Sequence, residues 1–173
     1  FKHWNAWHDY AYSHLFIASY SNGTVGQGVD IMPGERWDAP TGPFGGDEQV
    51  MFSPDGKKLA YTCKKLNGTD AAVSTNTDIY LYDLLSGTTS NLTEGMNGYD
   101  NDPCWSPDGK KLLWLSMEKA GYESDRNRLF QYTVETKQKT ELLPTFDYSV
   151  DNLAWSDDSR SIVLTAAKNA TKQ

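Results

Sequence analysis

Several absences narrow the class of protein to which this 173-residue chain can belong. Its two cysteines, Cys63 and Cys104, lie far apart and form no C-x-x-C pair, so they suit neither a disulfide framework nor a zinc site. No apolar run approaches the roughly 18–20 residues that a membrane-spanning helix needs. Basic residues are outnumbered, 16 Lys and Arg against 23 Asp and Glu, giving a net charge of −7. This balance argues against a nucleic-acid groove and an anionic membrane surface, which both require clustered Lys and Arg.

The residues that are abundant favour an antiparallel β-protein with short strands. Aromatic residues make up 13% of the chain, and 14 Gly and 7 Pro supply frequent turns. No segment shows the periodicity of a long helix. The chain starts at Phe1, without an initiator Met or an apolar signal segment, so we expect an internal segment of a longer protein.

Internal repeats are the most informative feature of the sequence. Residues 52–61 (FSPDGKKLAY) recur as residues 105–114 (WSPDGKKLLW) and, more weakly, as residues 155–164 (WSDDSRSIVL), at spacings of 53 and 50 residues. A second pattern, residues 78–87 (DIYLYDLLSG), matches residues 128–137 (RLFQYTVETK). Repeats of this length point to propellers or solenoids.

The first repeat motif predicts a tight hairpin turn. Proline fixes φ near −65° and glycine accepts a positive φ, as a turn between two apolar strands requires. We expect each serine to bond local backbone rather than act as a nucleophile, and each aspartate to stabilise its turn, because one carboxylate is too few for a calcium ion. The turn residues are Ser53, Pro54, Asp55, Gly56, Ser106, Pro107, Asp108 and Gly109.

Four short strands per repeat correspond to one propeller blade. We therefore predict an all-β fold, a partial β-propeller of four-stranded antiparallel blades with TolB-like repeats and about three blades' worth of chain. Its predicted parts are a leader with the outer half of a preceding blade (1–46), two full blades (47–97 and 98–147), and the inner half of a further blade (148–173). The acidic segment Asp100–Pro103 is expected to form a turn between blades.

A closed propeller needs at least about four blades, so these residues alone are not expected to close a ring. One hypothesis is a homodimer, in which the terminal half-blades of two copies complete each other and leave no open strand edge.

The motifs resemble those of a known family. Ser-Pro-Asp-Gly-Lys followed by Asp-Ile-Tyr-Leu-Tyr-Asp is similar to the propeller repeats of TolB and of prolyl oligopeptidase family serine peptidases. The leader, residues 2–9 and 13–17, and the segments 43–46 and 122–130 resemble acylaminoacyl and dipeptidyl peptidases of that family. The likeness is strongest to bacterial dipeptidyl-peptidase V-type enzymes of Bacteroides and Porphyromonas relatives.

This resemblance implies a C-terminal α/β-hydrolase domain that carries Ser, Asp and His and packs against the propeller. The sequence holds no G-x-S-x-G elbow, and its three histidines (His3, His8 and His14) all fall within the first 14 residues. We therefore expect no catalytic residue here, and no cofactor or metal, since the histidines lack ligand spacing. The repeat register suggests that both cysteines are buried, unpaired thiols.

The resemblance also implies a site for the free α-amine of a peptide substrate, for which a carboxylate is the natural partner. The candidates, all in segments between strands or blades, are Asp47, Glu48, Glu118, Glu123 and Asp125. The insert Lys64–Thr77 is an alternative contact with the hydrolase domain.

Two functions remain open from the sequence. The first is a propeller segment that gates substrate access in a serine exopeptidase and contributes to peptide binding. The alternative is a TolB-like propeller that binds a protein or peptide without catalysis. The resemblance further implies export to the periplasm.

Overall fold

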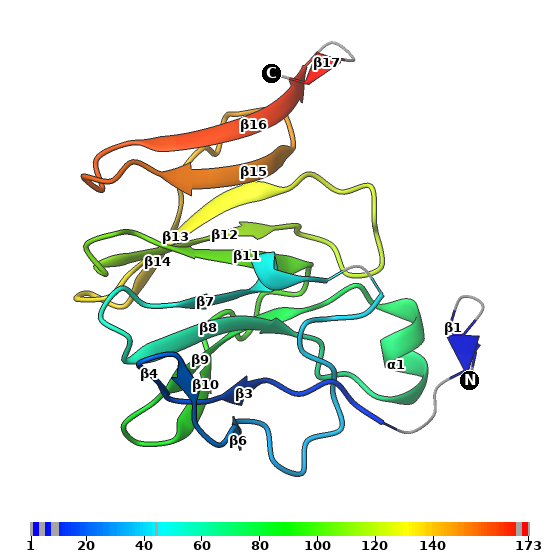
Figure 1. Ribbon diagram of the computed structural model, residues 1–173. Helices are drawn as coiled ribbons and strands as arrows, with labels where there is room; N and C mark the ends of the chain where they lie inside the picture. Colours follow the sequence, from blue (N-terminus) through cyan, green and yellow to red (C-terminus); the bar gives the residue numbers. More distant parts are fainter. Residues whose placement is uncertain (1, 4–5, 8–10, 44, 169–170, 173) are drawn as a thin grey trace.

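The computed structural model describes all residues except 1, 4–5, 8–10, 44, 169–170 and 173, and shows a stack of small antiparallel sheets (Figure 1). One four-stranded sheet has the order β10-β9-β8-β7 and the next has the order β11-β12-β13-β14. Their strands are β7 (Val50–Phe52), β8 (Lys58–Cys63), β9 (Asp78–Asp83), β10 (Thr88–Asn91), β11 (Asp100–Trp105), β12 (Lys111–Ser116), β13 (Arg128–Thr133) and β14 (Gln138–Glu141). Consecutive strands thus pair into four-stranded antiparallel blades, which confirms the predicted fold class.

Smaller sheets flank these two blades. The C-terminal sheet consists of β15 (Val150–Trp155), β16 (Ile162–Lys168) and β17 (Thr171–Lys172). At the other end, β3 (Phe16–Ile17) pairs with β6 (Val29–Asp30), and β4 (Tyr20–Ser21) with β5 (Thr24–Val25). A separate two-stranded sheet pairs β1 (Lys2–His3) with β2 (Ala6–Trp7). The described residues include two short helices, η1 (Asp47–Gln49) and α1 (Gly68–Val73). In this described part, no helix is long and apolar enough to cross a membrane.

The repeated turns are closed by their own side chains. The Ser53 hydroxyl donates to Asp55 Oδ1 at 2.7 Å and accepts the backbone N–H of Lys58 at 2.9 Å. Gly56 has a φ of 67°, the left-handed conformation that a glycine adopts without strain. The same serine–aspartate bond of 2.7 Å joins Ser106 to Asp108 and Ser156 to Asp158.

Three apolar clusters lie between successive sheets. Because side chains alternate along a strand, β8 sends Leu59 and Tyr61 into the cluster with Met32, and Ala60 into the cluster with Trp105. A third cluster forms around buried residues of the second blade and β15: Leu113, Leu115, Leu129 and Val150. Both faces of each full blade are therefore covered.

Both cysteines are free, as predicted. Cys63 is fully buried in the first cluster, as predicted, whereas Cys104 is only partly buried, so the prediction of a buried thiol is wrong for Cys104. Burial raises the pKa of both thiols, which keeps them protonated and unreactive near neutral pH.

The prediction of a turn at Asp100–Pro103 is wrong. These residues begin strand β11, which pairs with β12 and contains a β-bulge between Asn101 and Cys104. The polar segment can enter the sheet because Asp100, fully buried, accepts a hydrogen bond from Trp114 Nε1 at 3.1 Å. Asp102 takes a positive φ of 53° at the bulge.

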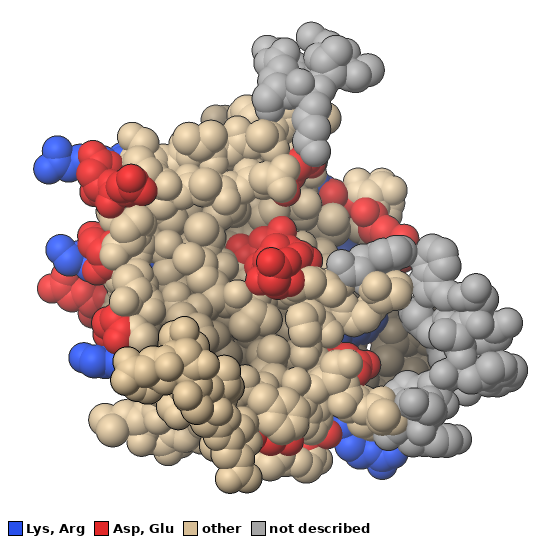
Figure 2. Space-filling model, in the orientation of Figure 1, with Lys and Arg blue, Asp and Glu red and all other residues tan. Residues whose placement is uncertain are grey.

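Antiparallel pairing places the connections of each blade at two opposite ends. We call one end the turn edge, formed by residues 53–57, 84–87, 106–110, 134–137 and 156–161, and the other the loop edge, formed by η1 and residues 64–77, 92–99 and 117–127. The turn edge lies on the left of Figure 1, and Figure 2 shows acidic and basic side chains mixed along it.

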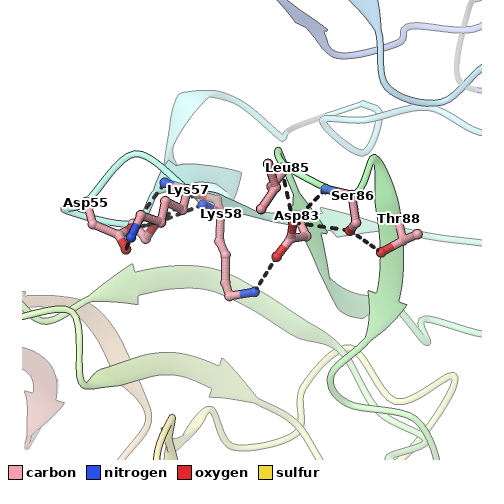
Figure 3. A network of polar contacts seen from close by, with 8 residues as sticks. Asp55, Lys57, Lys58, Asp83, Leu85, Ser86 and Thr88 are labelled. Atoms are coloured by element: carbon pink, nitrogen blue, oxygen red, sulfur yellow. Dashed lines mark hydrogen bonds and ion pairs between the residues drawn. The ribbon is translucent and has the colours of Figure 1, made fainter.

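A polar network at the turn edge joins two hairpins of the first full blade (Figure 3). Lys58 Nζ lies 2.8 Å from Asp83 Oδ2, and Asp83 Oδ1 accepts the backbone N–H groups of Leu85 and Ser86. The bond from Lys58 and that from Ser86 hold the pKa of Asp83 far below its usual value. Both oxygens of this carboxylate thus have partners within the blade, so Asp83 stabilises the turn.

Candidate functional site

The acidic residues at the loop edge begin with Asp47 and Glu48 of η1. Both are exposed, and Figure 2 shows a compact acidic patch where η1 lies in Figure 1. The next residue, Gln49, is buried and fixes η1 in place. Its Oε1 accepts the N–H and the hydroxyl of Thr41, both at 2.8 Å, and its Nε2 donates to the Tyr99 hydroxyl at 3.3 Å.

Two glycines allow the chain to approach η1 closely. A Cβ atom at Gly45 would overlap the Thr41 carbonyl oxygen and the Gln49 side chain. The backbone N–H of Gly46 donates to Glu48 Oε1 at 2.8 Å, which orients that carboxylate and leaves its second oxygen outside this bond.

Asp102 completes an acidic cluster with η1. Burial, together with the negative charge of Glu48, raises the pKa of Asp102 to about 6. The sequence prediction missed this residue because it assigned the segment to a turn. The alignment of the repeats could have revealed it. Cys104 aligns with Met51, so Asp102 aligns with Gln49 of the preceding repeat, near the start of an inner strand.

A second carboxyl on β11, Asp100, is fully buried. Burial raises its pKa to about 6, the hydrogen bond from Trp114 Nε1 and the nearby hydroxyls of Ser116 and Thr93 lower it, and the charge of Asp78 adds to the increase. Among the described residues, no group donates a hydrogen bond to Asp100 Oδ2. Two carboxyls with raised pKa values thus lie two residues apart on β11.

The remaining predicted carboxylates form a separate group in the loop between β12 and β13. Asp125 Oδ2 accepts the backbone N–H groups of Glu118 and Lys119, both at 2.9 Å, and its Oδ1 accepts that of Arg126. Partial burial tends to raise the pKa of Asp125, but these hydrogen bonds keep it below its usual value. Asp125 therefore organises the loop.

The two glutamates of this loop face basic residues. Glu118 Oε2 lies 3.8 Å from Arg128 Nη1, and the charge of Glu123 acts on Lys64 of the neighbouring insert. Among the described residues, no hydrogen bond or ion pair links this group to Asp47, Glu48 or Asp102. The structure thus brings Asp47 and Glu48 to Asp102 and leaves the other three candidates apart.

The one histidine whose side chain the structure describes has a structural partner. His14 Nδ1 lies 2.8 Å from Asp30 Oδ2, and its Nε2 lies 3.1 Å from the Glu35 carbonyl oxygen. The bond to Asp30 raises the pKa of His14, with burial acting against it. The side chains of His3 and His8 lie outside the described residues. In the described ranges, no three His, Cys, Asp or Glu residues are grouped to hold a metal ion.

Comparison with known proteins gives strong sequence matches. No family model matches the chain. Over 170 residues it is 47% identical to dipeptidyl-peptidase 5 of Porphyromonas gingivalis, in an alignment that covers 98% of this chain and 25% of that protein. The chain therefore spans about a quarter of the length of this curated relative.

Solved structures are similar in fold at low sequence identity. TolB from Acinetobacter baumannii superposes with a TM-score of 0.58 at 21% identity, over 90% of this chain and 36% of that one. Puromycin hydrolase superposes with a TM-score of 0.61 at 14% identity, over 90% of this chain and 24% of that one. At these identities the likeness concerns the fold alone.

The stacked four-stranded blades and these structural matches define the chain as a β-propeller segment. Within that class it is related, over nearly its whole length, to dipeptidyl-peptidase 5. The match confirms the resemblance that the repeats and the leader predict.

Proposed function

We propose that this chain is the propeller segment of a serine dipeptidyl aminopeptidase, where it restricts access to the active site and helps to bind the peptide. The observation that carries the proposal is the 47% identity to dipeptidyl-peptidase 5 along 98% of the chain. Hydrolysis is assigned to a C-terminal α/β-hydrolase domain of the full protein, by acyl-enzyme chemistry with a serine nucleophile.

In this proposal the loop edge faces the hydrolase domain, and its carboxylates bind the substrate's α-ammonium group. Asp47 and Glu48 are exposed there, and Asp102 lies near enough to Glu48 for the two charges to interact. Negative charges held together on a partly desolvated surface attract an ammonium group strongly. Glu118 and Glu123 stay as further candidates, whereas the oxygens of Asp125 are already engaged by backbone N–H groups.

The first experiment is an assay of the full-length protein with chromogenic dipeptidyl substrates, with and without a serine-directed inhibitor. We expect the inhibitor to abolish dipeptide release. If no dipeptide is released, the exopeptidase proposal fails and the TolB-like binding propeller becomes the better interpretation.

A substitution tests the amine site directly. Glu48→Gln removes a charge but keeps the shape of the side chain, and we expect KM to rise roughly 10- to 100-fold, as for the loss of one charged hydrogen bond. The turnover number should change little. Glu94→Gln is the matched control, because Glu94 is also exposed and lies in another connection at the loop edge. If Glu48→Gln and Glu94→Gln have the same KM, Glu48 does not bind the substrate amine.

The resemblance also supports export to the periplasm. Fractionation of the source cells tests this, and recovery of the protein with cytoplasmic markers alone would contradict it.

A further inference from the structure

An open surface pocket of about 700 Å³ lies beside the insert that carries α1. Its lining includes Tyr12, Glu35, Arg36, Trp37, Lys65 and Asn67, and we call it the Arg36 pocket. Lys65 follows the end of β8 and Asn67 directly precedes α1, so the pocket belongs to the loop edge. Its volume is within the usual range for small-ligand sites.

The turn that carries Arg36 is held at several points. The backbone N–H of Glu35 donates to the Met32 carbonyl at 3.0 Å, and Gly34 takes a φ of 78° between them. The N–H of Met32 donates in turn to Asp30 Oδ1 at 2.8 Å, and His14 contacts both Asp30 and the Glu35 carbonyl. These bonds fix the backbone on both sides of the pocket wall.

Of the two cations in the pocket, one has no partner among the described residues. Lys65 Nζ lies 2.6 Å from Glu35 Oε2 and 4.4 Å from the centroid of the Tyr80 ring, so its charge is neutralised. Arg36 is exposed and forms no hydrogen bond or ion pair with the described residues. The pocket lining thus carries a net positive charge on a chain whose net charge is −7.

The surroundings of Arg36 suit a planar anion with an organic body. A guanidinium group binds a carboxylate through two parallel N–H bonds. Asn67 makes no side-chain capping bond to α1, so its amide can donate a further bond. Trp37 packs against the first apolar cluster and supplies a fixed aromatic wall.

We propose that the Arg36 pocket binds the terminal carboxylate of a short peptide. The choice of a peptide rests on the proposed function, because a dipeptidyl peptidase meets short peptides with a free end. The loop edge would then offer carboxylates to the amine end of a peptide and Arg36 to a carboxylate end.

The test uses N-acetyl-glycylglycine, which carries the carboxylate but lacks the free amine required of a dipeptidyl substrate. Its titration into ¹⁵N-tryptophan-labelled protein is followed at the indole resonance of Trp37. We expect a dissociation constant of about 1 mM and no comparable shift with the carboxamide of the same peptide. Equal shifts with both compounds, or an equal shift with inorganic phosphate, would overturn the assignment to a peptide carboxylate.

Variants identify the residue responsible. Arg36→Gln should weaken binding of N-acetyl-glycylglycine roughly 10-fold or more, and Arg36→Lys should fall between Arg36→Gln and the parent. Arg160→Gln removes the same charge from an exposed residue of the turn edge and should bind like the parent. If Arg36→Gln binds as the parent does, the pocket is not the site. Because the probe has no free amine, this result does not depend on dipeptide release.

Discussion

Single residues at the loop edge show how burial changes the chemistry of a carboxyl group. Asp100 and Asp102 share one strand and the same raised pKa of about 6, but they differ in setting. Asp102 is partly exposed next to Glu48, where a ligand can reach it, whereas Asp100 is fully buried between two blades. We therefore assign Asp102 to the proposed site and expect Asp100 to affect only how stability varies with pH.

The raised pKa of Asp100 predicts how stability varies with pH. The folded chain holds this proton more tightly than the unfolded chain, so the stabilising effect is complete below about pH 4 and is lost as pH rises towards 6. Asp100→Asn keeps an acceptor for Trp114 and carries no charge, so we expect it to stabilise the protein by about 2 to 3 kcal/mol above pH 7 and to have little effect near pH 4.

Urea unfolding of Asp100→Asn at pH 4 and pH 8 checks this expectation. Asp157→Asn, at an exposed aspartate, is the control and should behave like the parent at both pH values. A lower stability of Asp100→Asn at pH 8 would show that the buried carboxylate is favourable in its ionised form.

At the scale of secondary-structure elements, each sequence repeat forms the same hairpin turn. The Ser-Asp pair occurs three times with the same bonds, but the burial of the serine differs. Ser106 is fully buried and Ser156 is partly exposed. If the serine hydroxyl is removed, water can replace its hydrogen bonds only at an exposed turn. The same hydrogen bonds therefore contribute more to stability at a buried turn than at an exposed one.

Ser106→Ala should therefore lower the free energy of unfolding by about 1 to 3 kcal/mol, because it leaves the N–H of Lys111 without its acceptor and removes one of the two hydrogen bonds to Asp108 Oδ1. The same change at Ser156, where water substitutes for the hydroxyl, should cost about 1 kcal/mol or less. Chemical denaturation of both variants compares them, and equal losses would contradict the role of burial.

The hairpins were predictable from the sequence because their causes are local. Proline, glycine and a serine–aspartate pair determine each turn within five residues, whatever the rest of the chain does. The place of Asp102 has no such local cause. It depends on the bulge in β11, on pairing with β12, which begins within about 10 residues, and on the approach of η1, which lies more than about 50 residues away. The Arg36 pocket likewise depends on His14 and Lys65, which the motifs did not connect.

At the scale of the whole molecule, the sheets at the two ends of the stack expose apolar side chains, whereas the faces of the two full blades between them are covered. Four apolar side chains of β3–β6 are 61–74% exposed, namely Phe16, Tyr20, Val25 and Val29. Val163 of β16 is 66% exposed at the other end of the stack. Apolar side chains gathered on an open sheet favour association with another sheet.

Residues 1–173 alone should consequently form a homodimer in which the end sheets meet. Size-exclusion chromatography with light scattering measures the mass directly. Phe16→Ser combined with Val29→Thr should shift the chain towards the monomer, and a monodisperse monomer of the parent sequence would reject the dimer hypothesis.

The order of the strands has a consequence for how the chain reaches its fold. In both full blades every strand pairs with its neighbour in sequence, so each blade is formed by one continuous stretch of chain, residues 50–91 and 100–141. Repeated units of this kind can add one after another onto those already formed. A blade can thus be completed as soon as its last strand is synthesised or translocated, and it then provides the apolar surface on which the next blade assembles.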